Sequence, residues 1–187
     1  MKRFVILLYL SAIITANVIT AAINPIQIGL FIIPAGSFVI GATFILRDFV
    51  QMYKGRKFVY LLIVISMILS GATSYLLGDS LWITFASIVT FLVSETTDTE
   101  IYTRLKFPFF VRVMYSGIVG GILDSVIFVV IGLSPLGANF IPWNAVIFAI
   151  IGQIVVKTIM QLLGAGIIRF SLSKGAKNLI KGSTHIN

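Results

Sequence analysis

Six apolar segments, each long enough to cross a lipid bilayer, follow one another along the chain with only short polar breaks between them. A membrane-spanning helix needs about 20 predominantly apolar residues. Only 11% of the residues are charged and 58% are hydrophobic, whereas about a quarter of a soluble domain is charged. We therefore predict an all-α integral membrane protein with six transmembrane helices and no soluble domain. The predicted helices are residues 4–22, 28–46, 58–77, 81–101, 109–133 and 144–168, which form a single transmembrane domain followed by a basic tail at 169–187.

The basic residues fall almost entirely on one side of this arrangement. With a cytoplasmic N-terminus, thirteen of the 14 Lys and Arg residues lie on the cytoplasmic side, including Arg47 and Arg112. The opposite side carries only Asp79, and Trp82 and Trp143 stand at the outer ends of helices. This distribution follows the positive-inside rule. It predicts a multi-pass protein of the cell (cytoplasmic) membrane with both termini in the cytoplasm, and it accounts for the net charge of +8 without a nucleic-acid partner.

Two segments of the predicted bundle have alternative interpretations. The first 22 residues combine a basic start, an apolar middle and small residues near Ala22, as a cleaved signal peptide does. We favour a retained helix because Asn17 is an unusual residue for a disposable apolar core. In the second helix, "IIPAGSF" (Ile32 to Phe38) is expected either to interrupt the helix and free backbone groups for a ligand or to form a packed kink.

The residue inventory closes most enzyme classes. The chain contains no cysteine, and its one histidine, His185, lies two residues from the end. Zinc sites and Ser–His or Cys–His catalysis therefore have no candidate residues, and no glycine-rich nucleotide loop is present. We expect no metal, no cofactor and no enzymatic activity. A membrane enzyme that uses Glu95 and Asp98 as an acid–base pair is a disfavoured alternative.

Three of the predicted helices carry polar residues at helical spacing inside the membrane. Charges there are costly and require a partner or a function. Each helix presents its polar residues as one stripe, because residues three or four apart share a face, and the three stripes predict a shared interior cavity. The stripes contain Glu95 and Asp98 in the fourth helix, Arg112 and Asp124 in the fifth, and Gln153 and Lys157 in the sixth.

The depths of these residues suggest two sets of ion pairs. At about 1.5 Å per residue, Asp124 and Lys157 lie near the bilayer midplane and can pair there. Asp98 or Glu95 can pair with Arg112 nearer the cytoplasm. For Asp98 with Arg112 a structural ion pair and a functional role are equally open, whereas for Asp124 with Lys157 we favour a function. Glu100 is predicted to be a boundary charge beside Arg104.

Five motifs in order resemble the vitamin uptake transporter family, whose best understood members are queuosine precursor transporters. They are "AN" at 16–17, "GATFILRDFVQMYKGRK" at 41–57, "SETTDTEIYTRLK" at 94–106, "GGILDSVIF" at 120–128 and "IGQIVVK" at 151–157. The resemblance covers nearly the whole chain. It implies import of a cyano-substituted deazaguanine, a purine-like precursor of queuosine in transfer RNA.

The polar stripes suit such a ligand. A guanine-like edge offers adjacent N–H donors that a carboxylate accepts in bidentate fashion, and aromatic rings stack on a flat base. We expect Asp124 or Glu95 to accept the hydrogen bonds from these N–H donors. The other expected substrate-binding residues are Gln153 and Lys157 as donors, Asn17 in support, and Phe91, Tyr115 and Phe128 as stacking rings.

Two transport mechanisms fit these expectations. The favoured one is a secondary transporter that works by alternating access, with no ATP-binding motif of its own. The alternative is the substrate-binding subunit of an energy-coupling-factor-type vitamin uptake complex, which is also built from six helices. A purely structural membrane protein is disfavoured by the three aligned polar stripes. The sequence leaves the oligomeric state and any partner subunits open.

Overall fold

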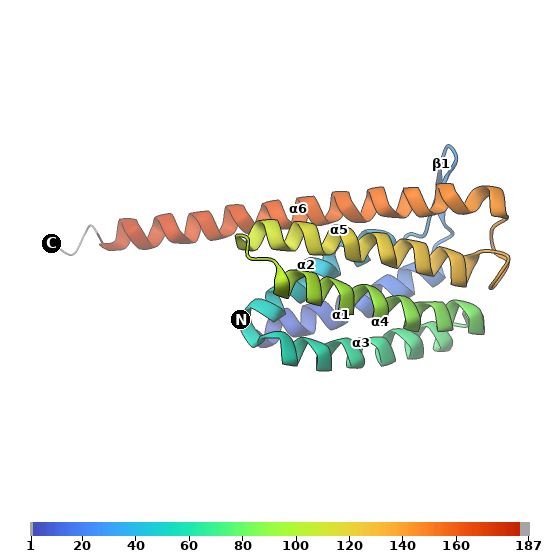
Figure 1. The fold of residues 1–187 in the computed structure, drawn as a ribbon, viewed down its shortest axis with the longest axis horizontal. Helices are drawn as coiled ribbons and strands as arrows, with labels where there is room; N and C mark the ends of the chain where they lie inside the picture. Colours follow the sequence, from blue (N-terminus) through green and yellow to red (C-terminus); the bar gives the residue numbers. More distant parts are fainter. Residues whose placement is uncertain (1, 184–187) are drawn as a thin grey trace.

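The computed structural model describes residues 2–183, with side chains for residues 3–166, and it is a single bundle of long helices (Figure 1). A short antiparallel hairpin, β1 (Ile26–Ile28) and β2 (Phe31–Ile33), pairs Ile26 with Ile33 and lies between the first two helices of the chain. A π-helical segment, η1 (Phe128–Leu133), continues the fifth helix. The helices are α1 (Lys2–Ala22), α2 (Ser37–Lys54), α3 (Arg56–Leu76), α4 (Leu81–Arg104), α5 (Phe109–Ile127) and α6 (Trp143–Ser183).

Most helix boundaries agree with the sequence-based prediction, but two helices differ from it. The second helix was predicted at residues 28–46, and that prediction is wrong: the hairpin occupies its first part, and α2 begins at Ser37 and continues to Lys54. The sixth helix runs past its predicted end at residue 168 to Ser183. The side chains of the predicted basic tail lie outside the described residues.

The shift of α2 has physical causes at both of its ends. Gly29 at the hairpin turn has φ +59° and Pro34 lacks a backbone N–H, so the chain turns before the helix begins. A side chain at Gly36 would collide with the carbonyl of Ala16, so the start of α2 packs directly on α1. At the other end, Arg47 is fully buried. The helix therefore continues through residues that looked like a polar loop.

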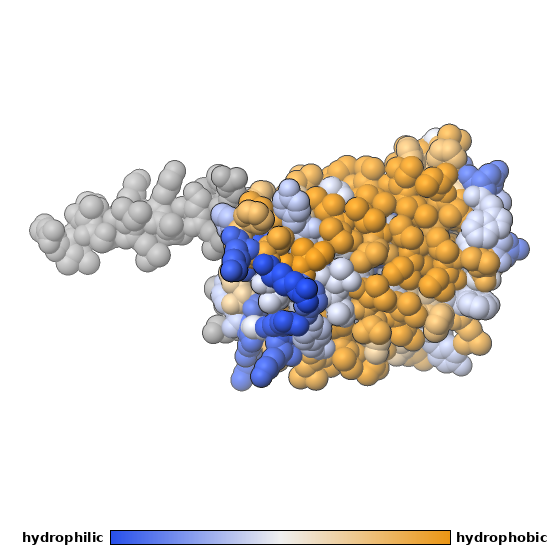
Figure 2. All heavy atoms as spheres, viewed as in Figure 1, coloured by the Kyte–Doolittle hydropathy of each residue, from blue (hydrophilic) through white to orange (hydrophobic). Residues whose placement is uncertain are grey.

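The surface divides into an apolar middle and polar ends (Figure 2). Exposed leucine, isoleucine, valine and phenylalanine side chains cover the sides of the helices. The start of the chain and the end of α6 point to the same end of the bundle (Figure 1), where basic residues gather (Figure 2). The exposed basic residues of the α2–α3 and α4–α5 connections are Lys54, Arg56, Lys57, Arg104 and Lys106. This is the surface of a multi-pass membrane protein.

Within the part of the chain that the structure describes, four helices are individually long and apolar enough to cross a membrane. These segments are Arg3–Ala22, Arg56–Leu76, Phe109–Leu133 and Trp143–Gly166. Helices α2 and α4, which complete the predicted six, each carry two buried charges, Arg47 and Asp48 in α2 and Glu95 and Asp98 in α4. Their polar faces are turned into the bundle rather than toward lipid.

Small residues let the helices approach closely around the polar interior. A side chain at Gly41 of α2 would come within 2.9 Å of the Lys157 carbonyl oxygen in α6. On α5, Gly120 lies against the Asp98 side chain of α4, and Gly117 lies against Gln161 of α6. Close packing over small residues is typical of helix association in membranes. It holds α2, α4, α5 and α6 around one interior space.

Candidate functional site

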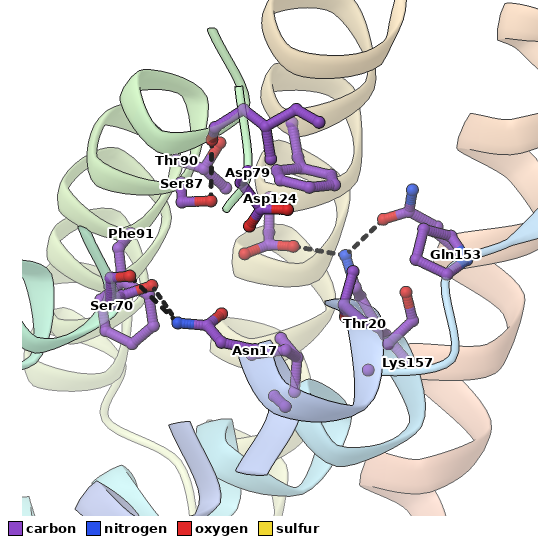
Figure 3. Close-up of a pocket in the computed structure, with 17 residues that line it drawn as sticks. Asn17, Thr20, Ser70, Asp79, Ser87, Thr90, Phe91, Asp124, Gln153 and Lys157 are labelled. Carbon is purple, nitrogen blue, oxygen red and sulfur yellow. Dashed lines mark hydrogen bonds and ion pairs between the residues drawn. The ribbon is translucent and has the colours of Figure 1, made fainter. Parts of the chain in front are cut away.

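A cavity of about 60 Å³ lies between the helices, in the half of the bundle away from the basic end. Its volume is sufficient for several water molecules. Every one of the six helices contributes to its wall, together with η1 and the turn that contains Asp79 (Figure 3). The lining polar residues are Asn17, Thr20, Ser37, Ser70, Asp79, Ser87, Thr90, Asp124, Gln153 and Lys157.

The predicted ion pair of Asp124 and Lys157 is present and forms one wall of the cavity (Figure 3). The Lys157 ammonium donates to Asp124 Oδ2, to Gln153 Oε1 at 2.9 Å and to Ser125 Oγ at 3.1 Å. An ammonium has three N–H donors, and all three are used. Lys157 therefore fixes the positions of its neighbours and has no donor left for a ligand.

Two atoms of this group remain available to a bound molecule. Gln153 is 1% exposed, and its Nε2 donates to no partner among the described residues. Asp124 binds Lys157 through Oδ2, which leaves Oδ1 as an acceptor. A buried donor without a partner costs about 1–3 kcal/mol. The pair Gln153 Nε2 and Asp124 Oδ1 therefore offers one donor and one acceptor to the cavity.

Asn17 connects α1 to α3 at the opposite wall. Its Nδ2 donates to Thr73 Oγ1 at 2.6 Å and to the carbonyl and hydroxyl oxygens of Ser70 at 3.1 and 3.2 Å. The amide oxygen points away from Ser70 (Figure 3). Because the nitrogen is held by α3, the oxygen is presented as a second acceptor on the cavity side.

Two of the three predicted stacking rings line the cavity, and the third does not. Phe91 in α4 is buried and Phe128 in η1 is half-buried. Phe128 begins the π-helical segment one turn after Asp124, and such segments are common at functional sites. Tyr115 is 61% exposed on the outside of α5. Its assignment as a stacking ring is wrong because it lies on the face of α5 that points away from the bundle interior.

Glu95 does not line the cavity but belongs to a second buried group on its basic-end side. We define the charge cluster as Arg47, Asp48, Glu95 and Asp98, which are 0%, 0%, 2% and 0% exposed. Arg47 pairs with Asp48 at 2.7 Å, with Asp98, and with Glu95 at 3.5 Å. The cluster joins α2 to α4 and lies between the basic end and the part of the cavity wall that Phe91 forms.

The predicted pair of Asp98 with Arg112 is therefore replaced by Asp98 with Arg47. Arg112 lies over the ring of Tyr102, with its guanidinium carbon 4.5 Å from the ring centroid, as in a cation–π contact. Arg47 had been counted among the cytoplasmic surface charges. The burial of Arg47 is the more important difference from the sequence-based prediction, because Arg47 supplies the central cation of the cluster. By contrast, Glu100 does pair with Arg104, at 3.2 Å, near the basic end.

Several lining residues were not among the predicted site residues. Asp79 accepts a hydrogen bond from Ser74 at 2.6 Å and lies in the cavity wall, in the turn between α3 and α4. Thr90 is 3% exposed, and its hydroxyl has no partner among the described residues. Thr90 lies one turn before Ser94, so the polar stripe of α4 is longer than its carboxylates suggested. Asp79 stands in a turn, where helical spacing carries no signal.

The residues that the structure describes contain no cluster of three or more histidine, cysteine, aspartate or glutamate side chains suited to a metal ion. A protein-family model described as "Putative vitamin uptake transporter" matches residues 58–170, which is more than half of the chain. The matched region includes Phe91, Asp124, Gln153 and Lys157 of the cavity. No curated protein and no solved structure matched the chain.

Proposed function

Because the chain belongs to the vitamin uptake transporter family, we propose that it imports a flat purine-like solute, a cyano-substituted deazaguanine, across the cell membrane by secondary transport. The observation that carries the choice of solute is that Lys157 holds Gln153 and Asp124 through one atom each, which leaves Gln153 Nε2 without a partner among the described residues and Asp124 Oδ1 as an acceptor. They contribute one donor and one acceptor to the same buried wall. A guanine-like ring presents complementary groups, a carbonyl oxygen and N–H groups.

Each proposed hydrogen bond uses one of the donor or acceptor atoms of the cavity wall identified above. Gln153 Nε2 donates to the ring carbonyl, and Asp124 Oδ1 accepts from the neighbouring N–H groups. Asn17 Oδ1 on the far wall accepts from a remaining N–H group. A site whose buried polar groups are satisfied only by the correct ligand strongly rejects analogues that lack those groups. This arrangement favours a deazaguanine over an adenine-like ring, which carries an amino group where guanine has the carbonyl.

The aromatic rings and the lysine have supporting roles in this proposal. Phe91 and Phe128 stack on the flat ring from α4 and η1. Lys157 holds Asp124 and Gln153 in place through its three hydrogen bonds. A change at Lys157 is therefore expected to disturb ligand binding by moving these two residues.

The cavity and the charge cluster suggest the direction of passage. Asp79 marks the cavity end away from the basic residues, which is the outer side under the positive-inside rule. On the basic-end side of Phe91, the charge cluster closes the route to that end, because its ion pairs hold α2 against α4. Alternating access requires this contact to open while the outer end closes. The solute would enter past Asp79 and leave between α2 and α4.

Thermal unfolding of the detergent-purified protein tests the ligand. A ligand at about a hundred times its dissociation constant adds about 2.7 kcal/mol to the folded state. We expect 7-cyano-7-deazaguanine to raise Tm, guanine to raise it less, and adenine and unrelated vitamins to leave it unchanged. Asp124→Asn should lose the shift, and Glu100→Gln, outside the cavity, should keep it. A shift with a different vitamin alone would overturn the proposed solute.

A further inference from the structure

The charge cluster holds more negative than positive charge in a place without access to water. Three carboxylates surround one guanidinium, and each of the four side chains is at most 2% exposed. With every group ionised, the cluster carries two excess negative charges. Uncompensated charge inside a membrane protein is costly. The cluster is therefore a place where a proton would relieve a large electrostatic cost.

Glu95 is the carboxylate that Arg47 compensates least. One terminal nitrogen of Arg47 serves both Asp48, at 2.7 Å, and Asp98. The other donates to the Glu95 backbone carbonyl at 2.9 Å and to Thr99 Oγ1 at 3.0 Å. The remaining ion pair of Glu95 joins its Oε2 to Arg47 Nε at 3.5 Å. Neither Glu95 Oε2 nor Arg47 Nε forms a hydrogen bond among the described residues.

The other groups that face Glu95 do not supply positive charge. Tyr9 of α1 lies beside Glu95, and Ser66 of α3 lies beside Tyr9; both residues are fully buried. The Tyr9 hydroxyl interacts with both Glu95 and Ser66, but it is a neutral group. On α5, Asp124 adds a further negative charge within reach of Glu95.

The two remaining cations of this region are engaged elsewhere. Lys157 of α6 is bound to Asp124, and Arg112 of α5 lies over the Tyr102 ring. Among the described residues, Arg47 is thus the one cation paired with Glu95, and it is shared with two other carboxylates. Glu95 is surrounded by proton donors and acceptors but lacks a cation of its own.

A stripe of buried hydroxyls joins the cavity to the cluster. Thr90, Ser94 and Asp98 follow one another at four-residue spacing along one face of α4, and Thr90 lines the cavity. Ser116 of α5 lies beside Asp98. Thr90, Ser94 and Ser116 are 3%, 1% and 0% exposed. The hydroxyls of Thr90 and Ser94 have no partner in the described part of the chain, and the Ser116 hydroxyl interacts with Asp98.

We propose that Glu95 is the proton-binding site of the transporter and carries one proton inward with each solute. A proton from the outer solution crosses the cavity and the buried hydroxyls and joins a carboxylate oxygen of Glu95, which becomes a neutral carboxylic acid. When the contact between α2 and α4 opens toward the cytoplasm, the proton leaves and the carboxylate is restored. No electron is transferred. The coupling to a solute rests on the proposed function, whereas proton binding by Glu95 does not.

Reconstituted vesicles separate the two proposals. Purified protein is placed in liposomes, and labelled 7-cyano-7-deazaguanine is followed in two ways: as exchange at equal pH, and as accumulation driven by a more acidic exterior. We expect wild type to show both, with about tenfold accumulation for each pH unit of a one-to-one symport. Glu95→Gln should keep exchange and lose pH-driven accumulation. Glu95→Asp should restore part of it, and Glu100→Gln should behave as wild type.

The possible results have distinct meanings. Wild-type exchange without pH-driven accumulation, or normal pH-driven accumulation in Glu95→Gln, overturns the proton site and leaves the proposed function. Absence of exchange in wild type overturns the proposed solute. The proton site is then decided by infrared spectroscopy of the purified protein without solute. A carboxylic-acid C=O band that titrates in wild type and is missing in Glu95→Gln supports the proposal, and identical spectra contradict it.

Discussion

At the scale of single residues, the site separates side chains that offer atoms to a ligand from side chains that position them. Lys157 looks like a ligand contact in the sequence, but its three donors are used by Asp124, Ser125 and Gln153. Gln153 gives its oxygen to Lys157 and keeps its nitrogen unpartnered. Sequence spacing placed both residues on one face of a helix. It could not indicate which of their atoms are satisfied, because that depends on partners from other helices.

The role of Gln153 predicts a result that depends on one atom. Gln153→Glu keeps an acceptor for Lys157 but removes the Nε2 donor. We expect binding of 7-cyano-7-deazaguanine to weaken by about 1–3 kcal/mol, or about 5- to 150-fold, and thermal stability to fall, because the new carboxylate lies in a buried site that already holds Asp124. Calorimetric titration measures the affinity and thermal unfolding the stability.

Gln161 provides a matched control on the same helix. It is buried and donates to the Val113 carbonyl at 2.7 Å, outside the cavity. Gln161→Glu removes that donor, so it should lower stability and leave affinity unchanged. If the two variants had the same effect on affinity, Gln153 would have no specific contact with the ligand.

At the scale of helices, apolar length predicted most of the bundle but not the second helix. Four helices are apolar enough to be recognised individually, and their positions were predicted well. The position of α2 depends on the hairpin before it and on the burial of Arg47 and Asp48 against α4. A polar segment that is buried by ion pairing looks like a loop in a single sequence. For the same reason, the partner of Asp98 was assigned to Arg112 instead of Arg47.

The contact between α2 and α6 gives a prediction at this scale. Gly41→Ala places a methyl group 2.9 Å from the Lys157 carbonyl oxygen and 2.8 Å from Met160. We expect the helices to be forced apart at a cost of about 1–3 kcal/mol, with weaker ligand binding because Lys157 moves. Unfolding temperature and ligand affinity should both decrease.

The same substitution at Gly166 of α6 is the control for that experiment. A side chain there would meet nothing within 4 Å. Gly166→Ala should be neutral or stabilising by up to about 1 kcal/mol, because alanine favours helix more than glycine does. Equal destabilisation by the two alanines would mean that the α2–α6 contact has no special importance.

At the scale of the whole molecule, the distribution of charge relates the bundle to the membrane. Exposed basic residues gather at one end (Figure 2), and buried charges lie between the helices. The native chain has no cysteine, so single cysteines can report the side on which each connection lies. Six crossings require Leu30 and Leu136 to face outward and Lys57 and Lys106 to face the cytoplasm.

Labelling with a membrane-impermeant maleimide tests this topology. Leu30→Cys and Leu136→Cys should react in intact spheroplasts, because both positions are exposed, at 66% and 62%. Lys57→Cys and Lys106→Cys should react only in inside-out vesicles. Reaction of positions 57 and 136 from the same side would contradict an arrangement in which α3, α4 and α5 all cross the membrane.

The measurement that tests the central claim most directly is uptake of labelled 7-cyano-7-deazaguanine by liposomes that contain this protein alone. The account predicts saturable uptake that requires no ATPase partner and is lost in Asp124→Asn, with Glu100→Gln as the active control. Tight binding without uptake would contradict secondary transport and identify the chain as the binding subunit of a larger complex. Neither binding nor uptake of this solute would contradict the assignment of the cavity to a deazaguanine.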